Sequence, residues 1–147
     1  MAAAEYGSWP SIGAFGPAID AVMRFLQALP AIYNADPLQM YLMGFSQGAA
    51  TSYATAMSHP SLVQAIAGLV GFVPADCQKP AYLDALHALP IFMAVGTKDP
   101  LIPVERTSEC AQVFRQARAQ LTYREYDTGH KINNQGFQDL QAWWSNR

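Results

Sequence analysis

Three side chains that could support nucleophilic catalysis each follow a run of residues typical of a β-strand. Ser46 lies in the G-x-S-x-G pattern of residues 44–48, and Asp99 and His130 follow two later strand-like runs. A serine hydroxyl becomes nucleophilic when a histidine takes its proton, while a carboxylate orients that histidine and stabilises its cation. The sequence therefore predicts acyl transfer by Ser46, with His130 as general base and Asp99 as the acid that orients it.

The G-x-S-x-G pattern gains its meaning from its place between a predicted strand and a predicted helix. A serine on a sharp strand-to-helix turn exposes its hydroxyl at the end of a sheet, and small residues beside it let strand and helix approach. Glycine or alanine occupies positions 44 and 48–50. The turn also aims the backbone N–H of Gln47, at the positive end of the helix, toward an oxyanion formed on Ser46. We therefore expect Gln47 to be an oxyanion donor.

Each of these residues also has a simpler interpretation. Ser46 could cap the backbone N–H groups of a helix, and Asp99, beside a proline, could be a turn former. Asp127 and Asp139 are rival acids. Asp127 stands three residues before His130 and is typical of a turn, whereas Asp139 falls in the last predicted helix, so Asp99 remains the expected partner of His130.

Apolar residues near the same strand ends could contact a substrate. Phe45 adjoins the nucleophile, and Phe72 and Ile102 each follow a strand. These three side chains are the predicted substrate-binding residues, lining an apolar acyl pocket.

The elements that must position these residues follow from hydrophobic periodicity and turn signals. The chain alternates between helical and strand-like segments, which implies crossover connections and a mostly parallel sheet with helices on both faces. The expected helices cover 15–29, 46–58, 103–119 and 137–144, and the expected strands cover 39–45, 65–73, 91–96 and 121–126, with an irregular segment at 76–88. We thus expect one α/β domain over residues 1–147.

Three details of this assignment are specific enough to check. Pro30 should end the first helix, because proline has no backbone N–H to continue it. The apolar strand 39–45 reads as buried on both faces. In the last helix, Phe137, Leu140 and Trp144 should line one side.

Composition excludes several classes of function. The 147 residues include 9 Lys+Arg against 11 Asp+Glu, a net charge of −2, which argues against nucleic-acid binding. Cys77 and Cys110 are isolated, so we expect no metal site and a reducing, cytoplasmic compartment. Neither a signal peptide nor an uninterrupted apolar run of roughly 20 residues is apparent, so we expect no membrane insertion.

Four segments together resemble the carboxylesterase/acyl-protein thioesterase branch of the α/β hydrolases. They are GFSQGAA at 44–50, VGFVP at 70–74, VGTKDPLIPVE at 95–105 and YREYDTGHKI at 123–132. The resemblance implies that Ser46 is the nucleophile, Asp99 the acid and His130 the base, and that esters or thioesters are hydrolysed without a cofactor. It covers only the C-terminal part of the family fold, because the N-terminal strands and the histidine- and glycine-rich loop that supplies a second oxyanion N–H have no counterpart.

Two functions follow as expectations. The first is a serine carboxylesterase of modest rate that acts on small, short-chain esters. The alternative is a non-catalytic remnant of a hydrolase that acts only through assembly with another chain. Without the family's N-terminal strands, strand 39–45 would present an apolar edge that lacks lysine and proline. We therefore expect a homodimer that buries strand 39–45 and the helix 15–29.

Overall fold

The computed structural model describes residues 9–147, which form a four-stranded parallel sheet in the order β1-β2-β3-β4. Its strands are β1 (Tyr41–Phe45), β2 (Ala65–Leu69), β3 (Pro90–Gly96) and β4 (Gln120–Tyr126). Tyr41 lies opposite Ala65, Ile66 opposite Ile91, and Pro90 opposite Gln120. The sheet order follows the order of the strands in the chain, so the carboxyl ends of all four strands meet at one edge of the sheet.

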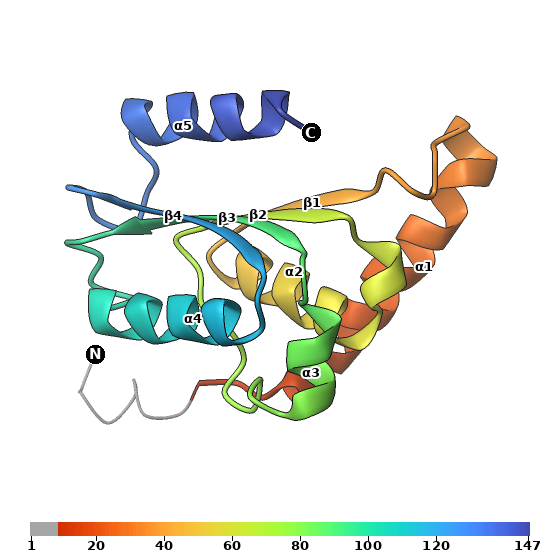
Figure 1. Cartoon of the computed structure of the whole chain (residues 1–147), viewed down its shortest axis with the longest axis horizontal. Helices are drawn as coiled ribbons and strands as arrows, with labels where there is room; N and C mark the ends of the chain where they lie inside the picture. The colour runs from red at the N-terminus through yellow and green to blue at the C-terminus, as the bar shows by residue number, and fades with distance from the viewer. Residues whose placement is uncertain (1–8) are drawn as a thin grey trace.

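A helix follows each strand, which is what parallel neighbours require. The helices are α1 (Gly16–Tyr33), α2 (Gln47–Ser58), α3 (Pro80–Ala85), α4 (Val104–Gln116) and α5 (Asn134–Ser145), with short 3-10 helices η2 (Ile12–Phe15) and η3 (Pro60–Leu62). Figure 1 shows α5 alone on one face of the sheet and the other helices on the opposite face. The predicted α/β class, with helices on both faces of a parallel sheet of four strands, is confirmed.

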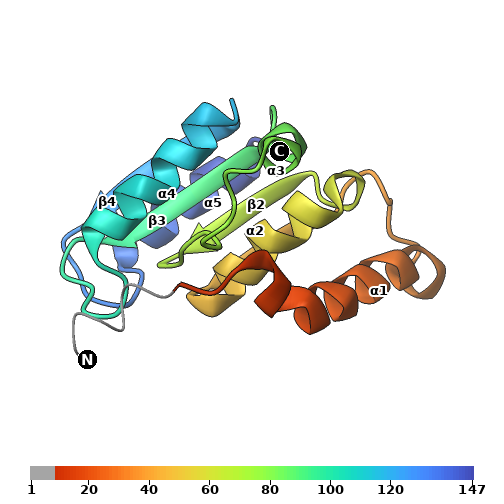
Figure 2. The same cartoon turned by 90° about the horizontal axis from the view of Figure 1, so that it is seen from below.

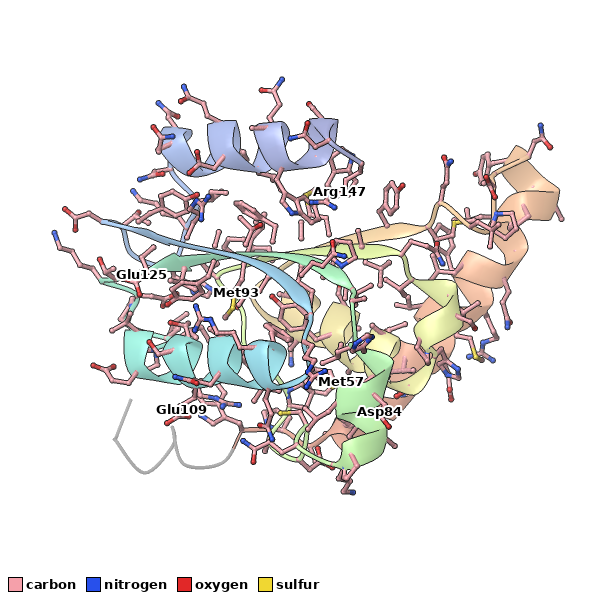
Figure 3. All side chains as sticks on the ribbon, in the orientation of Figure 1. Met57, Asp84, Met93, Glu109, Glu125 and Arg147 are labelled. Atoms are coloured by element: carbon pink, nitrogen blue, oxygen red, sulfur yellow. The ribbon has the colours of Figure 1, made fainter. Side chains whose placement is uncertain are left out.

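Two apolar layers hold the sheet. The larger layer joins the sheet to α1, α2 and α4, and Met93 of β3 belongs to it (Figure 3). The smaller layer joins the sheet to α5 through Phe92 and Trp143, whose ring centroids are 5.8 Å apart. β2 is buried along its whole length and β3 almost so, because both strands have a neighbour on each side and helices on each face.

The prediction that Pro30 ends the first helix is wrong. α1 continues through Pro30 to Tyr33 and ends at Asn34, whose φ of 53° is left-handed. An interior proline removes the hydrogen bond of its own N–H and crowds the carbonyl four residues earlier, but a helix that packs well can tolerate both costs. Asparagine adopts the left-handed conformation more readily than most residues and so terminates the helix.

The prediction that strand 39–45 is buried on both faces is also wrong. β1 stands at the edge of the sheet, where Met43 is 61% exposed and Phe45 is 47% exposed. An apolar run indicates that a strand favours burial, but it does not indicate which elements cover the strand. Whether neighbours cover it depends on distant parts of the chain.

The last helix is close to the expected arrangement. Phe137, Leu140 and Trp144 do share one side of α5, where they line a hollow of about 410 Å³ together with Met43 of β1. Phe137 is nevertheless 56% exposed, and the residue that α5 buries in the core is Trp143.

The segment Ile12–Tyr33 is long and apolar enough, by length and composition, to cross a membrane. Asp20 and Arg24 interrupt this apolar run, whose residues 15–29 the sequence analysis assigned to a helix of the α/β domain. Its Phe15, Ile19 and Leu26 pack in the core against the rest of the domain. Core helices of soluble proteins share these properties, so length and composition alone do not indicate a membrane protein.

Candidate active site

Ser46 occupies a strained turn between β1 and α2. Its backbone has φ 55° and ψ −116°, a conformation that non-glycine residues rarely adopt. The Ser46 N–H donates to the carbonyl of Leu69 at 2.8 Å, and the Ser46 carbonyl accepts from the N–H of Ala49 at 3.1 Å. Strain of this kind costs on the order of 1–3 kcal/mol and persists only where the surrounding structure enforces it. The side chain makes no cap hydrogen bond, so the simpler interpretation of Ser46 as a helix cap is not supported.

The turn requires glycine at only one of the two positions where the sequence analysis expected a small residue to be necessary. A Cβ atom at Gly44 would lie 2.2 Å from the backbone carbonyl carbon and oxygen of Gly48, whereas a Cβ atom at Gly48 would meet nothing within 4 Å. Glycine at 44 is therefore required by the crossing of β1 and α2. The expectation that Gly48 is needed for the same reason is wrong, because its missing side chain points into open space.

We expect Gly44→Ala and Gly48→Ala to change stability in opposite directions. The Gly44→Ala methyl collides with backbone that cannot rotate away, so it should lower the free energy of unfolding by about 3 kcal/mol. The Gly48→Ala methyl fits and reduces the entropy of the unfolded chain, so it should add about 0.5–1 kcal/mol. Urea unfolding of both variants measures the difference. Equal destabilisation of the two would contradict the assigned crossing of β1 and α2.

The loop after β2 supports the turn from the other side. The expected strand 65–73 is too long, because β2 ends at Leu69 and Val70 leaves the extended conformation. Val70 has φ 46°, a rare conformation for a β-branched residue, and its N–H donates to the carbonyl of Ala94 at 2.8 Å. A Cβ atom at Gly71 would lie 2.3 Å from the Cβ of Ala49 and 2.8 Å from the Ser46 carbonyl oxygen. The loop thus packs directly on the backbone of Ser46. A glycine right after an apolar strand was the available signal.

Asp99 and His130 meet at the same end of the sheet. Nδ1 of His130 and Oδ2 of Asp99 are 2.7 Å apart. Oδ1 of Asp99 accepts hydrogen bonds from the N–H groups of Leu101 at 2.8 Å and Ile102 at 3.0 Å. The side chain of Asp99 is only 1% exposed. Its Oδ1 therefore stays bonded to the loop, and its Oδ2 stays directed at His130. This contact is the pairing predicted from the sequence.

Two backbone hydrogen bonds bring these residues together. Thr97 donates to the carbonyl of Tyr126 at 2.9 Å, and Lys98 donates to the carbonyl of Thr128 at 3.0 Å. A Cβ atom at Gly96 would lie 2.2 Å from the carbonyl oxygen of Gly129, so glycine lets the two loops touch. The contact between Asp99 and His130 is therefore a consequence of how the ends of β3 and β4 join.

The rival acids have other partners. Asp127 forms an exposed ion pair with Lys98, with 2.7 Å between Oδ1 and Nζ. Asp139 accepts a hydrogen bond from the hydroxyl of Tyr126 at 2.7 Å, and this bond holds the pKa of Asp139 below its usual value. Both contacts are structural, which leaves Asp99 as the carboxylate that faces the imidazole.

The imidazole of His130 contacts the ring of Phe45, the residue before Ser46. The ring centroids of Phe45 and His130 are 5.2 Å apart, with the planes at 67° in an edge-to-face arrangement. Within residues 9–147, no hydrogen bond joins the hydroxyl of Ser46 to His130. Such bonds are often long in a protein without substrate and shorten in the complex. Phe45, predicted to contact substrate, precedes the nucleophile in the chain and packs against the ring of the base.

Gln47 is the first residue of α2, so its N–H has no acceptor within the helix. In the part of the chain that the structure describes, this N–H donates to no other group either. It is free to bind an anion beside Ser46, at the end of the helix where the dipole is positive. The role of oxyanion donor stays a prediction.

The other two predicted substrate contacts lie deeper than expected. Phe72 is 6% exposed, with the ring of Trp9 at 4.8 Å and that of Phe15 at 6.5 Å between centroids. Ile102 is 4% exposed. Their contact with substrate stays a prediction.

The cysteines do not compete with Ser46 as nucleophiles. Cys77 and Cys110 are both free and buried. Burial raises the pKa of the Cys110 thiol to about 11 and also raises the pKa of Cys77. The thiolate is the reactive form of cysteine, so both side chains are unreactive at neutral pH.

Comparison with known proteins agrees with this geometry. The sequence model of the phospholipase/carboxylesterase family matches residues 19–146. A probable carboxylesterase SOBER1-like protein of Arabidopsis thaliana is 25% identical over 114 residues, which are 76% of this chain and 44% of that protein. Acyl-protein thioesterase 1 of Gibberella zeae is 29% identical over 112 residues, which are 72% of this chain and 47% of that protein. The chain thus spans about half the length of these relatives.

Solved structures show the same fold. Arabidopsis thaliana SOBER1 matches 96% of this chain and 68% of its own, with a TM-score of 0.80 and 22% identity. The Bacillus cereus carboxylesterase matches 87% of this chain and 59% of its own, with a TM-score of 0.76 and 19% identity.

Proposed function

The chain belongs to the phospholipase/carboxylesterase family, and from this premise we propose that it is a serine esterase that hydrolyses short-chain carboxylic esters. The observation that carries the proposal is the 2.7 Å contact between Asp99 and His130 at the sheet edge where the strained Ser46 also lies. The three residue types, in this chain order, are those of acyl transfer in α/β hydrolases.

The proposed reaction has two steps. Ser46 Oγ attacks the ester carbonyl while Nε2 of His130 takes the hydroxyl proton, and the N–H of Gln47 stabilises the oxyanion. His130 then gives this proton to the departing alcohol, which leaves an acyl group on Ser46. In the second step, His130 deprotonates a water molecule that attacks the acyl carbonyl. The carboxylic acid leaves, and the proton returns to Ser46.

Asp99 serves both steps without changing its own protonation. Its carboxylate accepts a hydrogen bond from the Nδ1–H of His130, so the unprotonated Nε2 can act as base. The N–H groups of Leu101 and Ile102 hold the carboxylate in place while the imidazole becomes charged. The rate should be modest, because loss of one of two oxyanion donors typically costs about 10²–10³ in kcat.

A preference for short acyl chains is supported by the burial of Phe72 and Ile102. Trp9 and Phe15 cover Phe72, so Phe45 is the exposed one among the three predicted substrate contacts. One exposed ring among these three suits an acetyl or butyryl group better than a long acyl chain. Small esters are therefore the proposed substrates.

Labelling with a fluorophosphonate, together with hydrolysis of p-nitrophenyl esters, tests the proposal. We expect one covalent adduct per chain, located on Ser46 by peptide mass analysis, because labelling requires an activated serine. We also expect p-nitrophenyl acetate to be hydrolysed at least about tenfold faster than the palmitate ester, a difference of about 1.4 kcal/mol in transition-state binding. Prior heat denaturation should abolish both signals.

The alternative function is a non-catalytic remnant of a hydrolase that acts through assembly with another chain. The observation that favours it is the absence, within residues 9–147, of a hydrogen bond between Ser46 and His130. Under this alternative, the folded protein would neither take up the fluorophosphonate nor hydrolyse either ester.

A further inference from the structure

A short stretch that precedes α1 is bound across the loop that follows β2. The N–H of Ala75 donates to the carbonyl of Pro10 at 2.9 Å, and Oδ1 of Asp76 accepts from the N–H of Ile12 at 2.8 Å. In Figure 2 this stretch is the red segment that leads into α1. The two hydrogen bonds fix its path along the loop, and Trp9, directly before Pro10, is held beside the same loop.

The indole of Trp9 contacts an aromatic ring on the loop and a guanidinium group on α4. Its ring centroid is 4.8 Å from that of Phe72, and Cζ of Arg106 lies 5.2 Å from the indole centroid. A guanidinium at this distance attracts the face of an aromatic ring. Nη2 of Arg106 also donates to the carbonyl of Val73 at 2.6 Å, and the Arg106 side chain is only 13% exposed. Arg106 therefore ties the indole to the residue next to Phe72.

The ring that Trp9 covers belongs to the loop that supports the nucleophile. The carbonyl of Leu69 accepts from the N–H of Ser46 at 2.8 Å, and a Cβ atom at Gly71 would lie 2.8 Å from the Ser46 carbonyl oxygen. Phe72 is the next residue in the chain, and it is only 6% exposed. An apolar ring thus stands one residue from the backbone that contacts Ser46, with the indole of Trp9 packed against it.

The space that the indole fills is large enough to matter for substrate choice. An indole is larger than a butyl group, so its replacement by a methyl group frees room for several methylene groups. Trp9 is half-buried at the margin of the core, whereas Phe72 is enclosed. Loss of the indole therefore opens the space beside Phe72 to substrate and does not leave a sealed cavity. Each methylene group buried there strengthens binding about fourfold, the equivalent of about 0.8 kcal/mol.

We propose that Trp9 is the specificity-determining residue that restricts the esterase to short acyl chains, and that Arg106 is the positioning residue that holds the indole in place. This inference rests on the proposed function, because it concerns the acyl group that Ser46 carries. With Trp9 present, the acyl chain ends at the indole. Without Trp9, a longer acyl chain lies against Phe72. A single side chain outside the catalytic residues then decides between acetyl-sized and hexanoyl-sized substrates.

Hydrolysis of p-nitrophenyl acetate and p-nitrophenyl hexanoate tests the proposal. Trp9→Ala should raise the hexanoate-to-acetate ratio of kcat/KM by at least about tenfold, the equivalent of about 1.4 kcal/mol. Trp9→Phe keeps a ring on Phe72 and should keep the wild-type ratio. Arg106→Ala should raise the ratio by about threefold, because it removes the cation but leaves the hydrogen bonds that hold the segment.

Two further variants guard against a general effect of losing a tryptophan. Trp144→Ala is the matched control, because Trp144 packs on Tyr41 on the opposite face of the sheet, and its ratio should equal that of wild type. Trp9→Leu keeps part of the apolar cover, so it should fold even where Trp9→Ala does not. Its ratio should rise by about threefold, between those of Trp9→Phe and Trp9→Ala.

Binding of hexanoate, the product of the longer ester, tests the same space without catalysis. By titration calorimetry, Trp9→Ala should bind hexanoate at least about tenfold more tightly than wild type does, and the two proteins should bind acetate equally. If the proposed function fails, neither protein hydrolyses esters or takes up the fluorophosphonate, yet this difference in affinity persists. Equal hexanoate affinities, or an unchanged ester ratio in an active Trp9→Ala protein, would overturn the role of Trp9. A wild-type ratio in Arg106→Ala would overturn the role of Arg106.

Discussion

Replacement of Ser46 by alanine should lower esterase activity by about 10³-fold or more and abolish fluorophosphonate labelling. The expected loss is large because removal of the nucleophile from a serine hydrolase eliminates the acyl-enzyme pathway and leaves only oxyanion and binding effects. The measurement is the initial rate of p-nitrophenyl acetate hydrolysis at matched protein concentration. Ser58→Ala, at the far end of α2, is the control and should retain wild-type activity.

Stability should distinguish the chemical role of Ser46 from a structural one. Alanine is as strained as serine at φ 55°, so Ser46→Ala should keep the free energy of unfolding within about 0.5 kcal/mol of wild type. Glycine adopts positive φ freely, so Ser46→Gly should be inactive but more stable by about 1 kcal/mol. A Ser46→Ala protein that hydrolyses the ester at the wild-type rate would refute the assignment of the nucleophile.

Replacement of Asp99 by asparagine should lower kcat by about 10²- to 10⁴-fold, the upper figure being the loss seen for the equivalent change in a serine protease. The N–H groups of Leu101 and Ile102 will hold the amide oxygen in the position of Oδ1. The amide NH₂ group then faces Nδ1 of His130, which must accept a hydrogen bond. The imidazole proton therefore moves to Nε2, where it blocks removal of the proton from Ser46.

Asp127→Asn is the matched control, because it changes an acid close to His130 in sequence. Its ion pair with Lys98 is exposed, and such pairs contribute at most about 1 kcal/mol. We expect its kcat to stay within about threefold of wild type. A larger loss from Asp127→Asn than from Asp99→Asn would mean that the wrong carboxylate has been chosen.

Asp99→Ala should behave differently from Asp99→Asn in stability. Alanine leaves the N–H groups of Leu101 and Ile102 without their acceptor, which should cost about 1–3 kcal/mol for each group that stays buried. Asparagine keeps that acceptor, so the Asp99→Asn protein should unfold at nearly the wild-type urea concentration. The two variants together separate the effect of Asp99 on His130 from its effect on the loop.

The alternation of helices and strands, the parallel sheet and the turn at Ser46 could all be predicted from the sequence. The helices, the strands and the turn each depend on residues close together in the chain, and the parallel arrangement follows from the alternation of strands with helices. The G-x-S-x-G turn is an example, because Gly44 must be small for the backbone of Gly48, only four residues later, to approach it. Periodicity likewise reports the preferences of one segment for helix or strand.

Contacts between residues that are distant in the chain became known only from the tertiary structure. The sequence placed Asp99 and His130 at one edge of the sheet, but their contact depends on Lys98 and Thr128, whose backbones join the two loops. Phe72 looked accessible after its strand, yet Trp9, 63 positions earlier by residue number, covers it. Met43 looked buried, yet no described strand lies beside it. A hydrophobic side chain favours burial, but burial requires a second surface to cover it. Which surfaces meet is determined only when the whole chain has folded.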